Sequence, residues 1–175
     1  MLVIAATEGE LTGVDAGLVC GVGPVEAAAA TARVLAERRP DAVLNVGLAG
    51  AHGFGGCELV LGSEALYCDA ATPSLVPARA QPDPGLLARA RDAFPNARVA
   101  AIGTSARVNG TTGCDVEAME GFAVLRACAL AGVPALEVRV LSNEISEPDR
   151  GRWRFDDALA LLHETLPRLL EALDA

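Results

Sequence analysis

The chain carries the segment Asp115-Val-Glu-Ala-Met-Glu-Gly121 and, further on, Glu137-Val-Arg-Val-Leu-Ser-Asn143. The Ala- and Leu-rich residues between them predict a helix over residues 117–131, which Gly132 closes. The apolar run 135–141 predicts a buried strand. A helix followed by a buried strand is typical of an α/β fold. The polar side chains at the start of this helix and the end of this strand can converge on one ligand.

The same alternation of short apolar runs with Ala- and Leu-rich segments extends along the chain. Continuous apolar runs are typical of strands buried on both faces, so we predict a sheet covered by helices on both sides, in one domain over residues 1–175. The predicted strands are residues 2–6, 18–21, 42–47, 58–67, 98–103 and 135–141. The predicted helices are residues 24–38, 84–93, 117–131 and 155–173. The Pro-rich segment 70–82 is predicted to be a surface loop, either at an interface or at the rim of an active site.

The composition limits the kinds of partner that the protein can have. Of the 175 residues, 51% are apolar but only 3% are aromatic, so the core must consist mainly of Ala, Val and Leu. The formal net charge of −9 disfavours nucleic acids and anionic membranes, because their phosphates would be repelled. The N-terminal apolar run lacks a basic flank and is expected to be a strand rather than a signal peptide, and no apolar run is long enough to span a bilayer.

The cysteines favour a reducing compartment. The five of them, at positions 20, 57, 68, 114 and 128, include no Cys-x-x-Cys pair, and only two histidines accompany them. A zinc site is therefore not expected. An odd, scattered set of cysteines indicates small buried side chains in a reducing cytosol, so a cytoplasmic protein is expected.

Several motifs together resemble the nucleoside phosphorylase and nucleosidase superfamily. They are Met119-Glu120, the Arg-x-x-Ser-Asn pattern of residues 139–143, the Gly-Val-Gly turn of residues 21–23, and the Pro-Asp-x-x-x-Asn-x-Gly-x-Ala-Gly pattern of residues 40–50. The resemblance implies a three-layer phosphorylase/hydrolase-like fold, with a central mixed, largely parallel twisted sheet flanked by helices. It also implies a homo-oligomer, either a dimer or a tetramer, and an enzyme that needs no metal or cofactor.

A longer motif narrows the resemblance. The run Ser142-Asn-Glu-Ile-Ser-Glu-Pro-Asp-Arg-Gly-Arg-Trp153 is similar to a signature of the futalosine hydrolase family, with Ser146 where that signature usually carries Gly. Between Glu10 and Gly21 the chain is much shorter than is usual in the superfamily. The resemblance implies hydrolysis of the N-ribosidic bond of futalosine, to hypoxanthine and dehypoxanthine futalosine, in menaquinone biosynthesis.

Such a reaction builds positive charge on the ribose and needs a water molecule held by a carboxylate, contacts to the sugar hydroxyls, and donors to the leaving base. Glu10 matches the glutamate that orients the water, with Glu8 as the alternative. Glu120 matches the carboxylate that accepts hydrogen bonds from the ribose 2′- and 3′-hydroxyls, and Met119 is expected to pack on the sugar.

Arg139 is the third expected contributor to catalysis, with Glu10 and Asn143. A lone cation inside an apolar strand is costly unless it is paired. We discount Glu137 as its partner, on the expectation that the two side chains leave opposite faces of the strand. Because the superfamily places this arginine near the water, we expect Arg139 to pair with Glu10.

Asn143 is expected to read the base. Related nucleosidases that act on 6-aminopurines carry Asp here, whereas enzymes that act on 6-oxopurines carry Asn, whose amide can donate to O6 or N7. Ser142 is expected to contact the substrate beside it. Val108, in the loop 104–109, is expected to line the same base pocket.

The nucleophile is expected to be water rather than phosphate. Phosphorylases of the superfamily hold phosphate with arginines near the glycine turn and with a hydroxyl in the loop that here contains Gly47 and Leu48. This chain has no arginine before Arg33, and Leu48 occupies the hydroxyl position. Gly47 and Leu48 are expected to contact the substrate instead.

Four arginines compete for the carboxybenzoyl-type extension that futalosine carries at the ribose 5′ end. They are Arg107, Arg150, Arg152 and Arg154. An arginine suits a carboxylate because it forms charge-assisted hydrogen bonds. A solvent-exposed surface or a subunit contact is the alternative use of the basic cluster, and the sequence leaves the assignment open.

Three other functions compete with this prediction. A methylthioadenosine/adenosylhomocysteine nucleosidase is opposed by Asn143 and by the Asp-Arg-Gly-Arg-Trp run of residues 149–153. A purine nucleoside phosphorylase is opposed by the missing phosphate arginines. A non-catalytic nucleoside-binding relative would be expected to have lost its carboxylates, whereas Glu10 and Glu120 are both present.

Overall fold

The computed structural model describes residues 1–15, 17–70, 72, 74–108 and 113–174. Its strands are β1 (Leu2–Ala5), β2 (Gly17–Val19), β3 (Val43–Ala51), β4 (Leu59–Tyr67), β5 (Arg79–Ala80), β6 (Arg98–Thr104), β7 (Val116–Ala118) and β8 (Ala135–Glu144). Its helices are α1 (Pro24–Glu37), α2 (Pro84–Ala93), α3 (Gly121–Ala131) and α4 (Phe155–Asp174), with the 3₁₀ turns η1 (Gly9–Leu11) and η2 (Arg150–Arg152).

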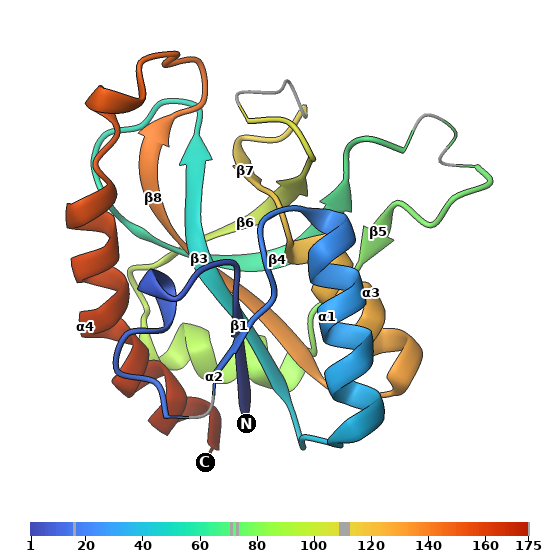
Figure 1. The fold of residues 1–175 in the computed structure, drawn as a ribbon. Helices are drawn as coiled ribbons and strands as arrows, with labels where there is room; N and C mark the ends of the chain where they lie inside the picture. The colour runs from blue at the N-terminus through green and yellow to red at the C-terminus, as the bar shows by residue number, and fades with distance from the viewer. Residues whose placement is uncertain (16, 71, 73, 109–112, 175) are drawn as a thin grey trace.

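The sheet lies between two pairs of helices (Figure 1). Helices α2 and α4 pack on one face, and α1 and α3 pack on the other. Successive side chains of a strand point to opposite faces, so Leu44 and Val46 contact the first pair of helices whereas Val43 contacts the second. The arrangement confirms the expected three-layer α/β fold, and its core is mostly Ala, Val and Leu.

Part of the sheet closes on itself. Strands β3, β8, β4, β6 and β7 pair in that order, and β7 pairs back with β3. The pairs β1–β2, β1–β3, β3–β8, β4–β6 and β6–β7 are parallel, whereas β3–β7, β4–β5 and β4–β8 are antiparallel. The sheet is therefore mixed and mostly parallel, as predicted. Between Ala49 and Gly50 of β3 the register with β8 shifts by one residue, which leaves Ser142 as an extra residue of β8 where both strands reach the cavity described below.

Most predicted elements are confirmed with small shifts at their ends, and local chemistry explains their limits. Helix α2 has the predicted bounds because the Asp83 side chain accepts a hydrogen bond from the Leu86 N–H (2.9 Å) and Pro84 occupies the first turn. Helix α3 ends where Gly132 adopts a left-handed conformation with φ of 68°.

Three predicted limits are wrong. The helix expected over residues 117–131 begins only at Gly121, because residues 116–118 form β7 between β3 and β6. A strand of three residues gives too short a pattern to separate from a helix start in the sequence. Strand β3 continues beyond residue 47 to Ala51, and the predicted loop 70–82 contains β5, which pairs with β4.

The cysteines follow the predicted pattern only in part. Cys20 and Cys128 are buried, whereas Cys57, Cys68 and Cys114 are half-buried. Burial raises the pKa of Cys20 to about 11 and that of Cys128 to about 12, so both thiols are protonated at neutral pH.

None of the helices in the described ranges combines the length and the apolar character that crossing a bilayer requires.

Candidate active site

A cavity of about 450 Å³ opens at the carboxyl ends of the parallel strands β1, β3 and β8 and extends to the start of α4. This edge is where α/β sheets usually bind ligands. Of the residues predicted to form the site, those that line the cavity are Glu10, Leu48, Val108, Met119, Glu120, Ser142 and Asn143. The sequence therefore identified seven of the nineteen described residues that line this cavity, although they lie far apart along the chain.

Two other predicted site residues, Gly47 and Arg139, do not line the cavity. A Cβ atom at Gly47 would lie only 2.6 Å from Glu10 Oε1 and 2.5 Å from Arg139 Nη1. Glycine is therefore required at position 47 by the close approach of two protein side chains, which is a different reason from the predicted substrate contact.

Glu10 is buried, although its short 3₁₀ turn lies near the surface. Its Oε2 accepts hydrogen bonds from the Thr7 N–H (2.9 Å) and the Thr7 hydroxyl (2.8 Å), and its Oε1 accepts one from the Leu48 N–H (3.1 Å). An ionised carboxylate has about four acceptor positions. Three are therefore satisfied by the protein, and the carboxylate keeps acceptor capacity for one further donor in the cavity.

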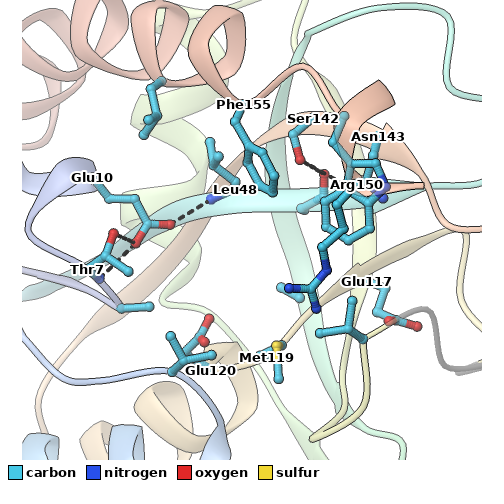
Figure 2. Close-up of a pocket in the computed structure, with 18 of the residues that line it drawn as sticks. Thr7, Glu10, Leu48, Glu117, Met119, Glu120, Ser142, Asn143, Arg150 and Phe155 are labelled. Atoms are coloured by element: carbon cyan, nitrogen blue, oxygen red, sulfur yellow. Dashed lines mark hydrogen bonds between the residues drawn. The ribbon is translucent and has the colours of Figure 1, made fainter. Parts of the chain in front are cut away.

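The side chains along the cavity are spread between two ends. Figure 2 shows Glu10 and Thr7 at one end and Ser142 and Asn143 at the other, with Glu120 along the wall between them. A nucleoside that spans the cavity would thus place different parts of itself against a carboxylate, a second carboxylate and an amide.

Glu120 sits at the junction between β7 and α3 and is buried. Its Oε1 accepts a hydrogen bond from the Gly23 N–H (3.1 Å), and its Oε2 accepts one from Arg139 Nη1 (3.2 Å). The glycine turn before α1 therefore holds a carboxylate of the protein itself. Met119 precedes Glu120 and lines the cavity as predicted.

The predicted partner of Arg139 is wrong. Its Nε donates to Glu137 Oε1 (2.9 Å) and its Nη1 to Glu120, while Glu10 lies outside ion-pair distance. Residues two apart in a strand point to the same face, so Glu137 and Arg139 were always able to meet. Burial lowers the pKa of Arg139, but Glu137, Glu120 and Glu10 outweigh it and raise the pKa overall, which keeps the guanidinium charged.

Ser142 fixes the amide of Asn143. Asn143 Oδ1 lies 2.8 Å from the Ser142 hydroxyl, which donates to it, and Asn143 Nδ2 donates to the Glu144 carbonyl oxygen (3.0 Å). With its oxygen engaged by Ser142, the amide has its second N–H available as a donor to a ligand.

The competing arginines differ clearly in their surroundings. Arg150 lines the cavity and lies over the Trp153 ring, with its guanidinium carbon 5.5 Å from the ring centroid. Arg152 pairs with Glu147 at 3.0 Å. Arg154 pairs with Asp157 at 2.8 Å, a contact that also raises its pKa.

Arg107 does not line the cavity formed by the described residues, although Val108 beside it does. Its backbone N–H donates to the Ser105 hydroxyl. Asn109, the end of the predicted loop, lies outside the described residues.

Sequence reasoning missed some of the lining. Thr7, which gives Glu10 two hydrogen bonds, stands three residues before it, and Val22, Phe155 and Leu159 line the cavity as well. Helical spacing places Leu159 in one apolar stripe of α4 with Leu162, Leu166, Leu169 and Leu173, and these four are buried in the core. Leu159 lines the cavity instead. Helical periodicity in a sequence does not distinguish an apolar side chain of the core from one that lines a cavity.

Comparisons with known proteins agree with this fold. The family model described as "Phosphorylase superfamily" matches residues 4–175. The chain is 34% identical to futalosine hydrolase of Streptomyces coelicolor, over 90% of this chain and 79% of the relative. It is 33% identical to futalosine hydrolase of Thermus thermophilus, over 87% of this chain and 80% of the relative.

A solved structure shows the same fold. The MTA/SAH nucleosidase of Streptococcus pneumoniae, in complex with 8-aminoadenine, matches with a TM-score of 0.84 over 98% of this chain and 99% of that chain, at 20% identity. The chain therefore belongs to the phosphorylase superfamily, and two of the curated relatives that it matches are futalosine hydrolases.

Proposed function

We propose that the protein is a nucleosidase that hydrolyses the N-ribosidic bond of futalosine to hypoxanthine and dehypoxanthine futalosine, a reaction of menaquinone biosynthesis. The two futalosine hydrolases that it resembles over most of its length support this substrate. The observation that carries the chemistry is the arrangement of Glu10, Glu120 and Asn143 along one cavity. Each of these side chains offers the hydrogen-bonding group that one part of a nucleoside needs.

In this mechanism Glu10 holds and deprotonates the attacking water. The water oxygen bonds to C1′ of the ribose while the C1′–N9 bond breaks, and the electron pair of that bond leaves with the base, which takes up a proton. Glu120 accepts hydrogen bonds from the ribose hydroxyls, and its negative charge stabilises the positive charge that develops on the sugar. Asn143 donates to the departing hypoxanthine.

The surroundings of Leu48 support water over phosphate as the nucleophile. The Leu48 N–H is already bonded to Glu10, and its side chain offers no hydroxyl. Arg33, the first arginine of the chain, pairs with Glu37 on α1 and does not line the cavity. Among the described residues that line the cavity, Arg150 is the one with a basic side chain.

Turnover is therefore expected to continue unchanged when phosphate is omitted. The measurement is release of hypoxanthine from futalosine in phosphate-free buffer and in added phosphate, with inosine and methylthioadenosine as comparison substrates. A requirement for phosphate, or a ribose-1-phosphate type of product, would contradict hydrolysis. Preferred release of adenine from methylthioadenosine would contradict the substrate while leaving a nucleosidase.

We propose further that Arg150 binds the carboxylate of the 5′ extension. Arg150 lines the cavity and, among the described residues, has no carboxylate within ion-pair distance, whereas Arg152 and Arg154 are paired. Trp153 and Phe155 line the same part of the cavity and offer apolar contact to an aromatic ring.

Replacing Arg150 with Met is expected to raise KM for futalosine by about tenfold or more, because a charge-assisted hydrogen bond is lost. Inosine lacks the extension and should be cleaved by wild type and Arg150→Met with similar kinetic constants. Arg152→Met is the matched control, since its side chain is 72% exposed and paired with Glu147. An equal effect on both substrates would show that Arg150 does not read the extension.

We also propose that residues 1–175 act as one domain in the cytoplasm and that two copies associate. A groove of about 870 Å³ runs between α1 and α3, and seven alanines contribute to its lining. Val25 and Leu130, which also line it, are 73% and 72% exposed. Protruding apolar side chains next to a recess of small residues on one face suit a self-complementary contact between two copies.

Leu130→Asp is therefore expected to convert the oligomer into monomers, measured by light scattering after size-exclusion chromatography at several concentrations. Leu75→Asp is the comparison, because Leu75 is 82% exposed in the segment 70–82, away from the groove. Dissociation by Leu75→Asp alone would move the interface to that segment. A monomeric wild type would contradict association.

A further inference from the structure

Glu137 on β8 is a fully buried carboxylate that lies outside the cavity. Its Oε1 accepts a hydrogen bond from Arg139 Nε at 2.9 Å. Its Oε2 has no hydrogen-bond partner among the described residues. Burial raises the pKa of Glu137, and the charge of Arg139 opposes that rise. A buried carboxylate with one unbonded oxygen costs folding free energy, so its presence needs a reason beyond stability.

Arg139 connects Glu137 to the cavity. Its guanidinium is also bonded to Glu120 (3.2 Å) and to Asn45 Oδ1 (2.8 Å), and Asn45 Nδ2 in turn donates to the Ile4 carbonyl oxygen (3.0 Å). The guanidinium is therefore held from three sides, and one of those sides is Glu120, which does line the cavity. Glu137 contacts the guanidinium from outside the cavity lining.

The glycine after Glu120 belongs to the same arrangement. A Cβ atom at Gly121 would overlap the carboxylate of Glu137. The Glu120-Gly121 pair thus has a structural explanation: the glycine makes room for Glu137, and a close approach of ligand is not required to account for it. Helix α3 begins at Gly121, so the carboxylate also lies against the positive end of a helix dipole.

We propose that Glu137 is a positioning residue of the ribose site, which acts through Arg139 on Glu120. This inference rests on the proposed function, in which Glu120 binds the sugar hydroxyls. Glu137 fixes the plane of the guanidinium through Nε, so that Nη1 points at Glu120. Arg139 pairs with both Glu137 and Glu120, so its single positive charge does not neutralise Glu120 fully. Glu120 therefore keeps negative charge that stabilises the positive charge developing on the sugar.

The alternative position of the guanidinium explains why the hold is needed. Arg139 Nη1 and Glu10 Oε1 approach each other across Gly47, where no side chain separates them. Without Glu137, the contacts to Asn45 and Glu120 remain, and the charge of Glu10 then attracts Arg139 away from Glu120. Loss of Glu137 would then disturb both Glu10 and Glu120, the two carboxylates of the proposed mechanism.

A double-mutant cycle tests the proposal. Glu137→Leu removes the oxygen that accepts from Arg139 Nε and is expected to lower kcat/KM by about 10- to 100-fold in the wild-type background, because a side chain misplaced by about 1 Å has effects of that order. In a Glu120→Gln background the same change should lower kcat/KM by no more than about threefold, since residues that act through one another are not additive. Equal losses in both backgrounds, or no loss in either, would overturn the proposal.

A control separates positioning from general destabilisation. Val138→Ala alters the next residue of β8, which is fully buried against α2 and α4 on the opposite face. It should lower the melting temperature and leave kcat/KM near the wild-type value in both backgrounds. If Glu137→Leu does not fold, Gly121→Ala displaces the Glu137 carboxylate from the other side and should show the same dependence on Glu120.

A structural readout keeps this inference apart from the choice of substrate. In a crystal structure of Glu137→Leu, or of Gly121→Ala, the contacts from Glu120 to Arg139 and to the Gly23 N–H are expected to be lost or lengthened. Retention of both contacts would overturn the role of Glu137, whatever nucleoside the enzyme cleaves. Failure of the wild type to cleave futalosine would instead overturn the proposed function, and the cycle would then be run on the ribonucleoside that it does cleave.

Discussion

Replacing Glu10 with Gln is expected to lower kcat by about 10²- to 10⁴-fold and to leave KM nearly unchanged, because Gln keeps the shape of the side chain but cannot accept the proton of the attacking water. The three hydrogen bonds that orient Glu10 come from Thr7 and Leu48. A Gln amide can keep the two bonds from Thr7 on its oxygen, but its NH₂ group then faces the Leu48 N–H. Some loss of stability is therefore expected beside the loss of rate.

The measurement is steady-state release of hypoxanthine from futalosine, together with the melting temperature of each protein. Glu8→Gln is the matched control, because Glu8 lies in the same turn but is exposed and does not line the cavity. A Glu10→Gln protein within a few-fold of wild type would remove Glu10 as the general base. A strong effect of Glu8→Gln in its place would transfer that role to Glu8.

Replacing Asn143 with Asp is expected to depress cleavage of futalosine more than cleavage of its 6-amino counterpart. In the proposed mechanism the Asn143 amide donates to O6 and N7 of hypoxanthine, whereas a carboxylate would repel O6. A buried acceptor left unmatched costs about 1–3 kcal/mol, which corresponds to about 5- to 150-fold in the ratio of kcat/KM. A site built to match one set of polar groups rejects the mismatched analogue in this way.

The ratio of kcat/KM for the two substrates, measured on both proteins, decides this prediction. The ratio is needed because Asn143→Asp also disturbs the protein itself: one oxygen of the new carboxylate would face the Glu144 carbonyl oxygen, to which Asn143 now donates. That cost affects both substrates alike and cancels in the ratio. An unchanged ratio would show that Asn143 does not read the base.

The sequence predicted the fold class and seven of the described residues that line the cavity from patterns that are local to the chain. Continuous apolar runs predicted the central strands, and the predicted bounds of α2 agree with its Asp83 cap and with Pro84 in its first turn. Resemblance to the motifs of the nucleoside phosphorylase and nucleosidase superfamily marked Glu10, Glu120 and Asn143 as candidates. These features depend on neighbours within a few residues, which a sequence displays directly.

Pairing across the sheet could not be predicted in the same way. Residues 116–118 look like the start of α3, and only their pairing with β3 and β6 makes them a strand. The expected pair of Arg139 with Glu10 is wrong. Residues two apart in a strand point to the same face, so Glu137 and Arg139 meet and are bonded. Which of the arginines at 150, 152 and 154 keeps its charge unpaired depends on Glu147 and Asp157.

By itself the sequence determined which side chains carry charge, which segments are apolar enough to be buried, and which family the chain resembles. The tertiary structure decided how the charges are combined. Gly47 makes room for Glu10 and Arg139, which are more than thirty residues away in the sequence. Gly121 makes room for Glu137, which is sixteen residues away. Coulomb interactions and steric exclusion act through space, and their partners are set only when the strands and helices pack.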